Sequence, residues 1–305
     1  MNRLVARLEG LLLLLVVVVG TLGVAVPGPG RLVDQSGAID PTLAVLVLTT
    51  GLSIDAAAMS GARRRWGRLL VVLAVSTVVL PPLAWGVGHL VAGPVRDGVL
   101  AVGVAPSEVA SVGFVGLVGG EVAVAAALVG ASAVVTVLAA GPALELLANA
   151  SSVHPVGLLA TLGLVVALPL LAGSALRQSL HLGGRILDVG RLVGLLSLLG
   201  LLWEVASEVQ LRSEYVMVTV ALLGFLAGAA VLGRLVSWGL PPHAEPGVLL
   251  PIAMRDFAVA AGIATAAFGP AATGPLGIYG FMVLLFGAGA GRLGRGRWSR
   301  RHPPR

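Results

Sequence analysis

Three ionisable residues, Glu108, Arg255 and Asp256, lie inside long apolar stretches of the sequence. An ionisable side chain within a membrane helix costs roughly 2.5–3.5 kcal/mol, so such groups face a polar cavity or pair with one another. A carboxylate in this setting can carry a proton, and an arginine can hold a carboxylate through two parallel hydrogen bonds. We therefore take these residues as candidates for an ion- or solute-binding site. The alternative is a buried ion pair that only holds two helices together.

A proline comes shortly before each charged site. Pro106 precedes Glu108, and Pro251 precedes Arg255 and Asp256. Because proline lacks an N–H and its ring collides with the carbonyl four residues earlier, both prolines predict a helix break. Broken backbone at membrane depth must line protein or water, and half-helix ends bind ions and polar groups. The paired breaks favour a transport site over a purely structural ion pair.

The composition is that of an integral membrane protein. Hydrophobic residues make up 57% of the 305 positions and charged residues 11%, whereas a soluble domain carries about 25% charged residues. Cysteine is absent, and the five histidines include no pair at metal-ligand spacing, so we expect no disulfide, no metal site and no bound cofactor. The net charge of +6 comes from arginines at the ends of apolar runs. Membrane orientation explains these arginines better than a nucleic-acid partner does.

Apolar runs long enough to cross a bilayer, about 20 residues each, recur along the whole chain. The alternative interpretation of the first run is a signal peptide. We predict ten membrane-spanning helices, at 10–27, 38–57, 69–92, 98–118, 121–148, 155–176, 189–207, 215–236, 247–268 and 274–291.

The arginines predict the orientation of these helices. Most of them fall on one side of the predicted membrane, including Arg3, Arg7 and the cluster at 63–65, and only Arg31, Arg96 and Arg212 fall on the other. Positively charged loops stay in the cytoplasm. We therefore expect a multi-pass protein of the cell (inner) membrane, with its N- and C-termini both in the cytoplasm.

The two interrupted runs are the fourth and the ninth of ten. These are corresponding positions if the chain consists of two five-helix halves, 1–150 and 151–305, the second with a short basic tail. A repeat with an odd number of spans inserts upside down relative to its twin. The predicted fold class is therefore an all-α polytopic membrane protein of about ten transmembrane helices, arranged as two inverted five-helix repeats.

Three stretches resemble the bile acid:sodium symporter family, in its order along the chain. They are LVLTTGLSIDAAAMSGARRRWGRLLVVLAVSTVVLPPLAW (46–85), GVAPSEVASVGFVGLVGGEVAVAAALVGASAVVTVLAAGPALELL (103–147) and IAMRDFAVAAGIATAAFGPAATGPLGIYGFMVLL (252–285). The chain is identified as a divergent, bacterial-type member. The resemblance implies that broken helices four and nine cross at mid-membrane. It also implies a core domain of helices 3–5 and 8–10, a panel domain of helices 1, 2, 6 and 7, and a substrate cleft between them.

The family's ion-binding motifs are altered in this sequence. The fourth-helix Ala-Ser-Asn keeps its serine as Ser111 but has Val112 in place of asparagine, and a third-helix glutamine falls near Ser76. Ser107, at the first break, joins these candidate substrate- or ion-binding residues.

The ninth-helix motif departs further. Where the family has glutamate, two residues, methionine, glutamine and asparagine, this chain has Pro251, two residues, Met254, Arg255 and Asp256. Most sodium-binding side chains of relatives are thus replaced. A proton, or no ion, is the expected coupling ion in place of the usual two Na⁺. We also expect a Glu108–Arg255 ion pair across the crossing; whether a carboxylate there carries the proton or Arg255 holds the substrate stays open.

The resemblance implies secondary active transport of a small organic anion or amphipathic solute by alternating access. The partners expected are a small-molecule substrate and the lipid bilayer, with the chain a monomer or a homodimer. A membrane-embedded enzyme is the first alternative, but it needs a nucleophile beside a base. No histidine falls in the middle of a span, and Ser107 and Glu108, as sequence neighbours, point apart. The other alternative is a non-transporting membrane protein.

Overall fold

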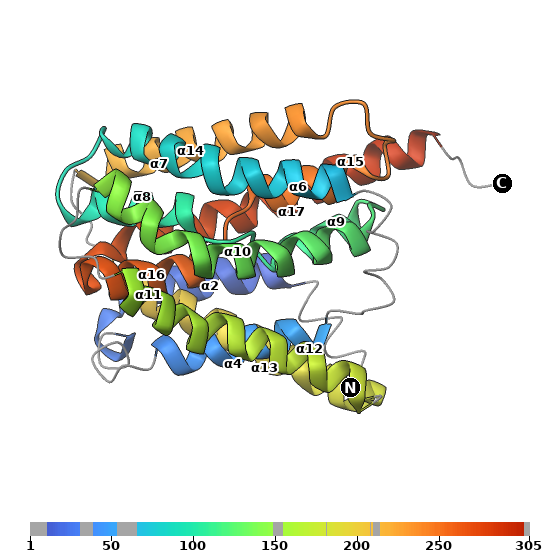
Figure 1. The fold of residues 1–305 in the computed structure, drawn as a ribbon, viewed down its shortest axis with the longest axis horizontal. Coiled ribbons are helices and arrows are strands. Elements are labelled where there is room, and N and C mark those ends of the chain that lie inside the picture. The colour runs from blue at the N-terminus through green and yellow to red at the C-terminus, as the bar shows by residue number, and fades with distance from the viewer. Residues whose placement is uncertain are drawn as a thin grey trace.

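The computed structural model describes residues 11–30, 39–53, 66–148, 155–180, 182–207, 209 and 214–301. All regular elements among these residues are helices. They run lengthwise along one elongated bundle (Figure 1). The arginines at positions 3, 7 and 63–65, on which the predicted orientation depends, lie outside the described residues.

One helix, or two or three successive helices, lies at each predicted span. The first five spans correspond to α2 Leu12–Ala25; α4 Ile39–Ser53; α6 Trp66–Ala74, η2 Val75–Val79 and α7 Leu80–Gly88; α8 Pro94–Val104 and α9 Ala110–Leu117; and α10 Val122–Ala148. The last five correspond to α11 Pro155–Leu162, η3 Gly163–Ala167 and α12 Leu168–Ser179; α13 Gly184–Ser207; α14 Glu214–Val236; α15 Glu245–Ala253 and α16 Phe257–Phe268; and η4 Pro270–Ala272 with α17 Gly274–Arg301.

Six helices in the described part of the chain are long and apolar enough to cross a membrane, judged by length and composition. Shorter apolar helices account for the first two predicted spans and for α16. Large apolar side chains also lie on the outside of the bundle, among them Val78, Leu138 and Leu164, each more than 60% exposed. An outward apolar surface fits contact with lipid hydrocarbon.

Two spans contain a π-helical turn just before a proline. In the third span, η2 precedes Pro81 and Pro82, and in the sixth, η3 precedes Pro169. Proline cannot donate to the carbonyl four residues earlier, and a wider turn accommodates its ring. In η2 this local widening carries the buried Ser76.

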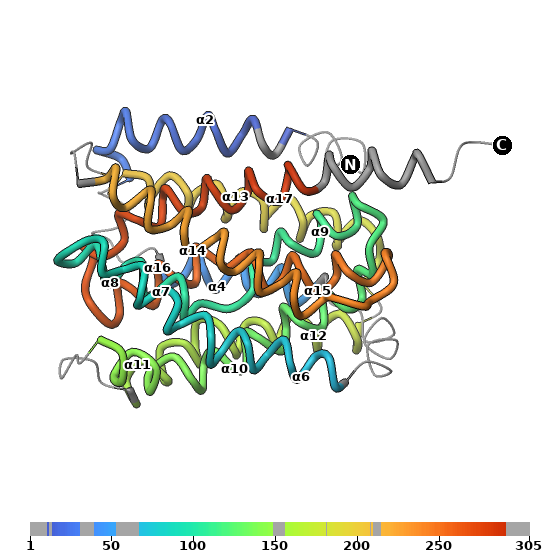
Figure 2. Tube along the Cα trace, turned by 90° about the horizontal axis from the view of Figure 1, so that it is seen from above, coloured from blue at the N-terminus to red at the C-terminus, as the bar shows by residue number. Residues whose placement is uncertain are grey.

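Several pairs of helices pack closely along the bundle. α4 packs against α12 and α13, and α13 packs against α2. Figure 2 shows α2 along one edge of the bundle, beside α13 and α17. The approach of α4 to α12 is close, because a Cβ on Gly173 would lie 2.2 Å from the Leu48 carbonyl oxygen. α7 packs on α8, and α14 packs on α15.

Loops predicted to lie on the same side of the membrane contact each other. The Glu121 N–H donates to the His243 carbonyl at 2.9 Å, and these two side chains approach to 3.1 Å. At the opposite end, a Cβ on Gly98 would lie 2.2 Å from the Ala272 carbonyl oxygen. These contacts fit the predicted alternation of spans.

Candidate functional site

The two interrupted spans meet at their gaps. Residues between α8 and α9 pair with residues between α15 and α16 through an isolated antiparallel bridge, Ser107 to Arg255. The Glu108 N–H donates to the Met254 carbonyl at 2.9 Å, and the Asp256 N–H donates to the Pro106 carbonyl at 2.9 Å. Each gap thus supplies the hydrogen-bond partners that the other has lost by leaving the helix. The sequence prediction that two broken helices lie together is confirmed.

The two prolines act differently from one another. Pro106 lies in the first gap itself, after the end of α8 at Val104. Pro251 instead lies inside α15, which continues to Ala253 before the chain becomes extended at Met254. The second break therefore comes later than we predicted from the proline. Because proline lacks only one N–H, α15 loses a single helical hydrogen bond at Pro251 and continues for two more residues.

Glu108 and Asp256 both lie at the start of a half-helix. Asp256 is the N-cap of α16, where its Oδ1 accepts from the N–H groups of Ala258 and Val259 at 3.0 Å each. Glu108 precedes α9, and its Oε1 accepts from the Ala110 N–H at 3.2 Å. Helix N-termini carry partial positive charge and unpaired N–H groups, so they stabilise carboxylates. The side chains are 1% exposed for Glu108 and 3% exposed for Asp256.

Arg255 is the largest fully buried side chain in the described part of the chain. Its backbone N–H donates to the Tyr279 hydroxyl of α17 at 3.0 Å, and its Nη2 donates to the Ala105 carbonyl. Its Nε and Nη1 have no hydrogen-bond partner among the described residues. The guanidinium therefore donates to a single carbonyl, and its Nε and Nη1 donate to no described residue.

The predicted Glu108–Arg255 ion pair is wrong. Among the described residues no ion pair joins these two side chains, and Glu108 Oε2 and two guanidinium nitrogens lack partners. The register of the bridge explains this result. Ser107 lies opposite Arg255, so Glu108 lies opposite Met254, and successive side chains of extended backbone point to opposite faces. Glu108 therefore shares a face with Asp256, its diagonal neighbour, and Arg255 points to the other face.

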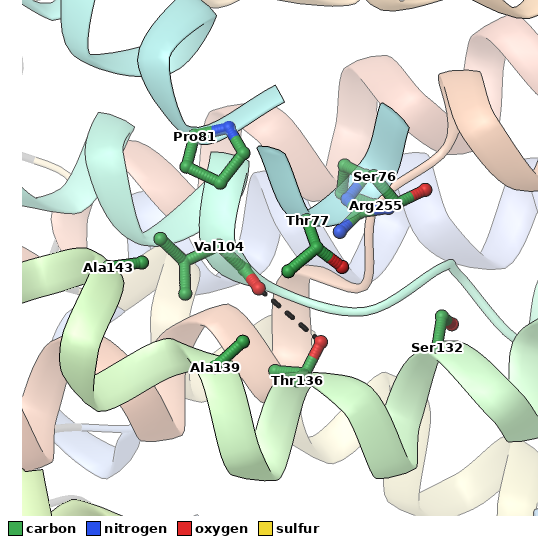
Figure 3. A pocket seen from close by; sticks show the side chains of 9 residues that line it. All are labelled: Ser76, Thr77, Pro81, Val104, Ser132, Thr136, Ala139, Ala143 and Arg255. Atoms are coloured by element: carbon green, nitrogen blue, oxygen red, sulfur yellow. Dashed lines mark hydrogen bonds between the residues drawn. The ribbon is translucent and has the colours of Figure 1, made fainter. Parts of the chain in front are cut away.

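The guanidinium of Arg255 enters a small pocket between η2, α7, the end of α8 and α10. The pocket measures about 10 Å³, which is room for about one water molecule. Its lining is drawn in Figure 3 and consists of Ser76, Thr77, Pro81, Val104, Ser132, Thr136, Ala139, Ala143 and Arg255.

The pocket is the meeting point of several hydroxyl groups. Ser132 Oγ accepts from the Ser107 N–H at 3.0 Å, and Thr136 Oγ1 lies 3.5 Å from the Val104 carbonyl (Figure 3). Ser76 Oγ is buried and has no partner among the described residues. Of the predicted residues, Ser76 and Arg255 line the pocket, and Ser107 adjoins it through the bond of its N–H to Ser132.

The remaining candidates lie elsewhere around the crossing. Ser111 is fully buried in the first turn of α9, and Met254 contributes its carbonyl to Glu108. Sequence reasoning missed Ser132, Thr136 and Tyr279. The four-residue spacing of Ser132 and Thr136, which places both on one face of a helix, was the available signal for two of them.

The chain matches the family described as the sodium bile acid symporter family over residues 40–219, which is more than half of its length. The chain belongs to this family. No curated protein matches it significantly.

Family membership establishes the general activity. Members are transporters and not enzymes, so this chain is a multi-pass membrane protein and a secondary transporter of a small molecule. The matched range contains the first interrupted helix and Glu108, and it ends before Arg255 and Asp256. The second interrupted helix lies outside the family match, so its place in the site follows from its contacts with the first.

Replacing Ser132 with alanine is expected to lower the free energy of unfolding by about 1–3 kcal/mol, because the buried Ser107 N–H loses its acceptor. Thermal unfolding of detergent-purified protein measures this change. Ser179→Ala is the matched control, since Ser179 also donates to a carbonyl of its own helix but is exposed and accepts from no other segment in the described part of the chain. Equal melting temperatures for the two variants would contradict the role given to Ser132.

Proposed function

We propose that this chain is a proton-coupled secondary transporter of a small organic anion. The observation that carries this proposal is the placement of two buried carboxylates, Glu108 and Asp256, on one face of the crossing. Intramembrane carboxyl groups are the usual carriers of protons in pumps and transporters. Of the two, Glu108 is the proton carrier, because Asp256 is engaged by two N–H groups whereas Glu108 Oε2 has no partner among the described residues.

Sodium is a poorer candidate for the coupling ion. At most positions where the family's motifs carry a sodium ligand, this sequence has a different side chain. Val112 and Arg255 are the clearest departures. A proton on Glu108 also removes the free-energy cost of a buried charge that forms no ion pair with any described residue.

An anionic substrate is supported by the helix ends at the crossing. The N-termini of α9 and α16 both begin there, directly after the gaps. Their partial positive charges favour a carboxylate. The family's description, which includes bile acids, agrees with an acidic amphipathic solute.

Alternating access in this proposal uses two domains that move against each other. The core consists of spans 3–5 and 8–10 and the panel of spans 1, 2, 6 and 7, from two inverted repeats at 1–150 and 151–305. The contacts of α4 with α12 and α13, and of α13 with α2, support the panel. The crossing belongs to the core and faces a substrate cleft between the domains. We propose that both termini are cytoplasmic and that the unit is a monomer or a homodimer.

Reconstituted vesicles test the coupling. Purified protein is placed in vesicles with an entrapped pH-sensitive dye, and cholate or a short aliphatic carboxylate is added under an imposed pH gradient or an imposed Na⁺ gradient. We expect uptake and dye response under the pH gradient in the absence of Na⁺. Uptake that requires Na⁺ and ignores the pH gradient would contradict proton coupling.

A further inference from the structure

The face of the crossing opposite Glu108 and Asp256 presents oxygen atoms to a positive charge. The Ala105 carbonyl accepts from the guanidinium of Arg255. The hydroxyl-bearing residues Ser76, Ser132 and Thr136 line the pocket that the guanidinium enters (Figure 3). Carbonyl and hydroxyl oxygens are the groups that replace the hydration shell of a small hard cation. The pocket is therefore chemically a cation site.

The fit between this pocket and an arginine is incomplete. A guanidinium has five N–H donors in a fixed planar fork, yet Nε and Nη1 of Arg255 are buried without a partner among the described residues. Ser76 Oγ is also buried without a partner there. The oxygens of the pocket thus surround the positive charge of Arg255 but do not match the directions of its N–H groups. Such an arrangement suits a spherical ion better than a planar guanidinium.

We propose that Arg255 is a tethered cation that occupies a latent binding site for a monovalent metal ion such as Na⁺. This inference rests on the proposed function and deepens it, since the tethered charge would make sodium unnecessary in a family described as sodium symporters. With Arg255 removed, the oxygen-lined pocket is enlarged and no longer receives the positive charge of the guanidinium. A free cation then takes the place of the guanidinium among these oxygens.

The test is sodium binding by purified protein, read from thermal unfolding in NaCl against choline chloride at equal ionic strength. We expect Arg255→Ala to gain a sodium-dependent rise in melting temperature of about 3 °C at roughly ten times the dissociation constant. Wild type and Arg255→Lys, which keep the tethered charge, are expected to show no rise. Arg255→Met also stays unresponsive, because a long apolar side chain fills the pocket.

A matched control is Arg234→Ala, which removes an arginine that is paired with Glu245 near the end of α14 and is 60% exposed. An Arg255→Ala protein that responds to Na⁺ no more than Arg234→Ala does would overturn the proposal. A wild-type protein stabilised by Na⁺ would overturn it as well, and this measurement stands even if Arg255→Ala fails to fold. Because the readout is binding without transport, a failure here leaves the vesicle result for proton coupling unaffected.

Discussion

Replacing Glu108 with glutamine is expected to reduce pH-driven uptake to roughly a tenth or less of the wild-type rate, because a proton relay needs a carboxyl group. Glutamine has nearly the same shape, and its side-chain oxygen can still accept from the Ala110 N–H as Glu108 Oε1 does. The variant therefore keeps the contact that starts α9 but has no proton to release. Uptake into vesicles under an imposed pH gradient, with the amount of folded protein matched, measures the change.

Glu145→Gln is the control for this experiment. Glu145 is an exposed carboxylate near the end of α10, on a helix that also lines the pocket. Its substitution is expected to leave uptake unchanged. Full pH-driven uptake by Glu108→Gln would remove the proton carrier from the proposed mechanism.

The second large effect concerns the cap of α16. Asp256→Ala is expected to lower the free energy of unfolding by about 2 kcal/mol, because the buried N–H groups of Ala258 and Val259 lose their acceptor. Asp256→Asn is expected to retain most of the stability, since asparagine caps a helix about as well as aspartate. Thermal unfolding of the two variants in detergent gives the comparison. If asparagine destabilises the protein as much as alanine does, the charge of Asp256 and not its capping oxygen stabilises the crossing.

The sequence was sufficient to predict where the helices lie and which ionisable residues lie in the two gaps. Ionisable groups stand out in an apolar chain because lipid penalises them so strongly, and a nearby proline marks where helical hydrogen bonding fails. Glu108, Arg255 and Asp256 carry both signals, and the structure places all three within the two paired gaps.

The partners of these residues could not be predicted in the same way. Which side chains face each other depends on the register of the Ser107–Arg255 bridge, and a shift of one residue exchanges the two faces. The predicted Glu108–Arg255 pair failed for this reason. A sequence shows that two gaps exist but contains no local signal for the residue at which they pair.

The hydroxyl groups that line the pocket could not be predicted from the sequence for a different reason. Serine and threonine are tolerated within membrane helices because they donate to a carbonyl of the preceding turn, as Ser132 does to Val129. A structural hydroxyl and one that lines a pocket therefore look alike in the sequence. Only the packing of α10 against the first gap separates Ser132 from the other serines.

The register of the crossing is the claim on which the site, the proton carrier and the tethered cation all depend. Because the chain has no cysteine, paired cysteine variants can test it by disulfide formation without background. In an antiparallel pair of this type the two Cα atoms are about 4.5 Å apart, within disulfide range. We predict that Ser107→Cys with Arg255→Cys forms a disulfide and that Glu108→Cys with Arg255→Cys does not. Efficient cross-linking of the second pair and none of the first would contradict the account.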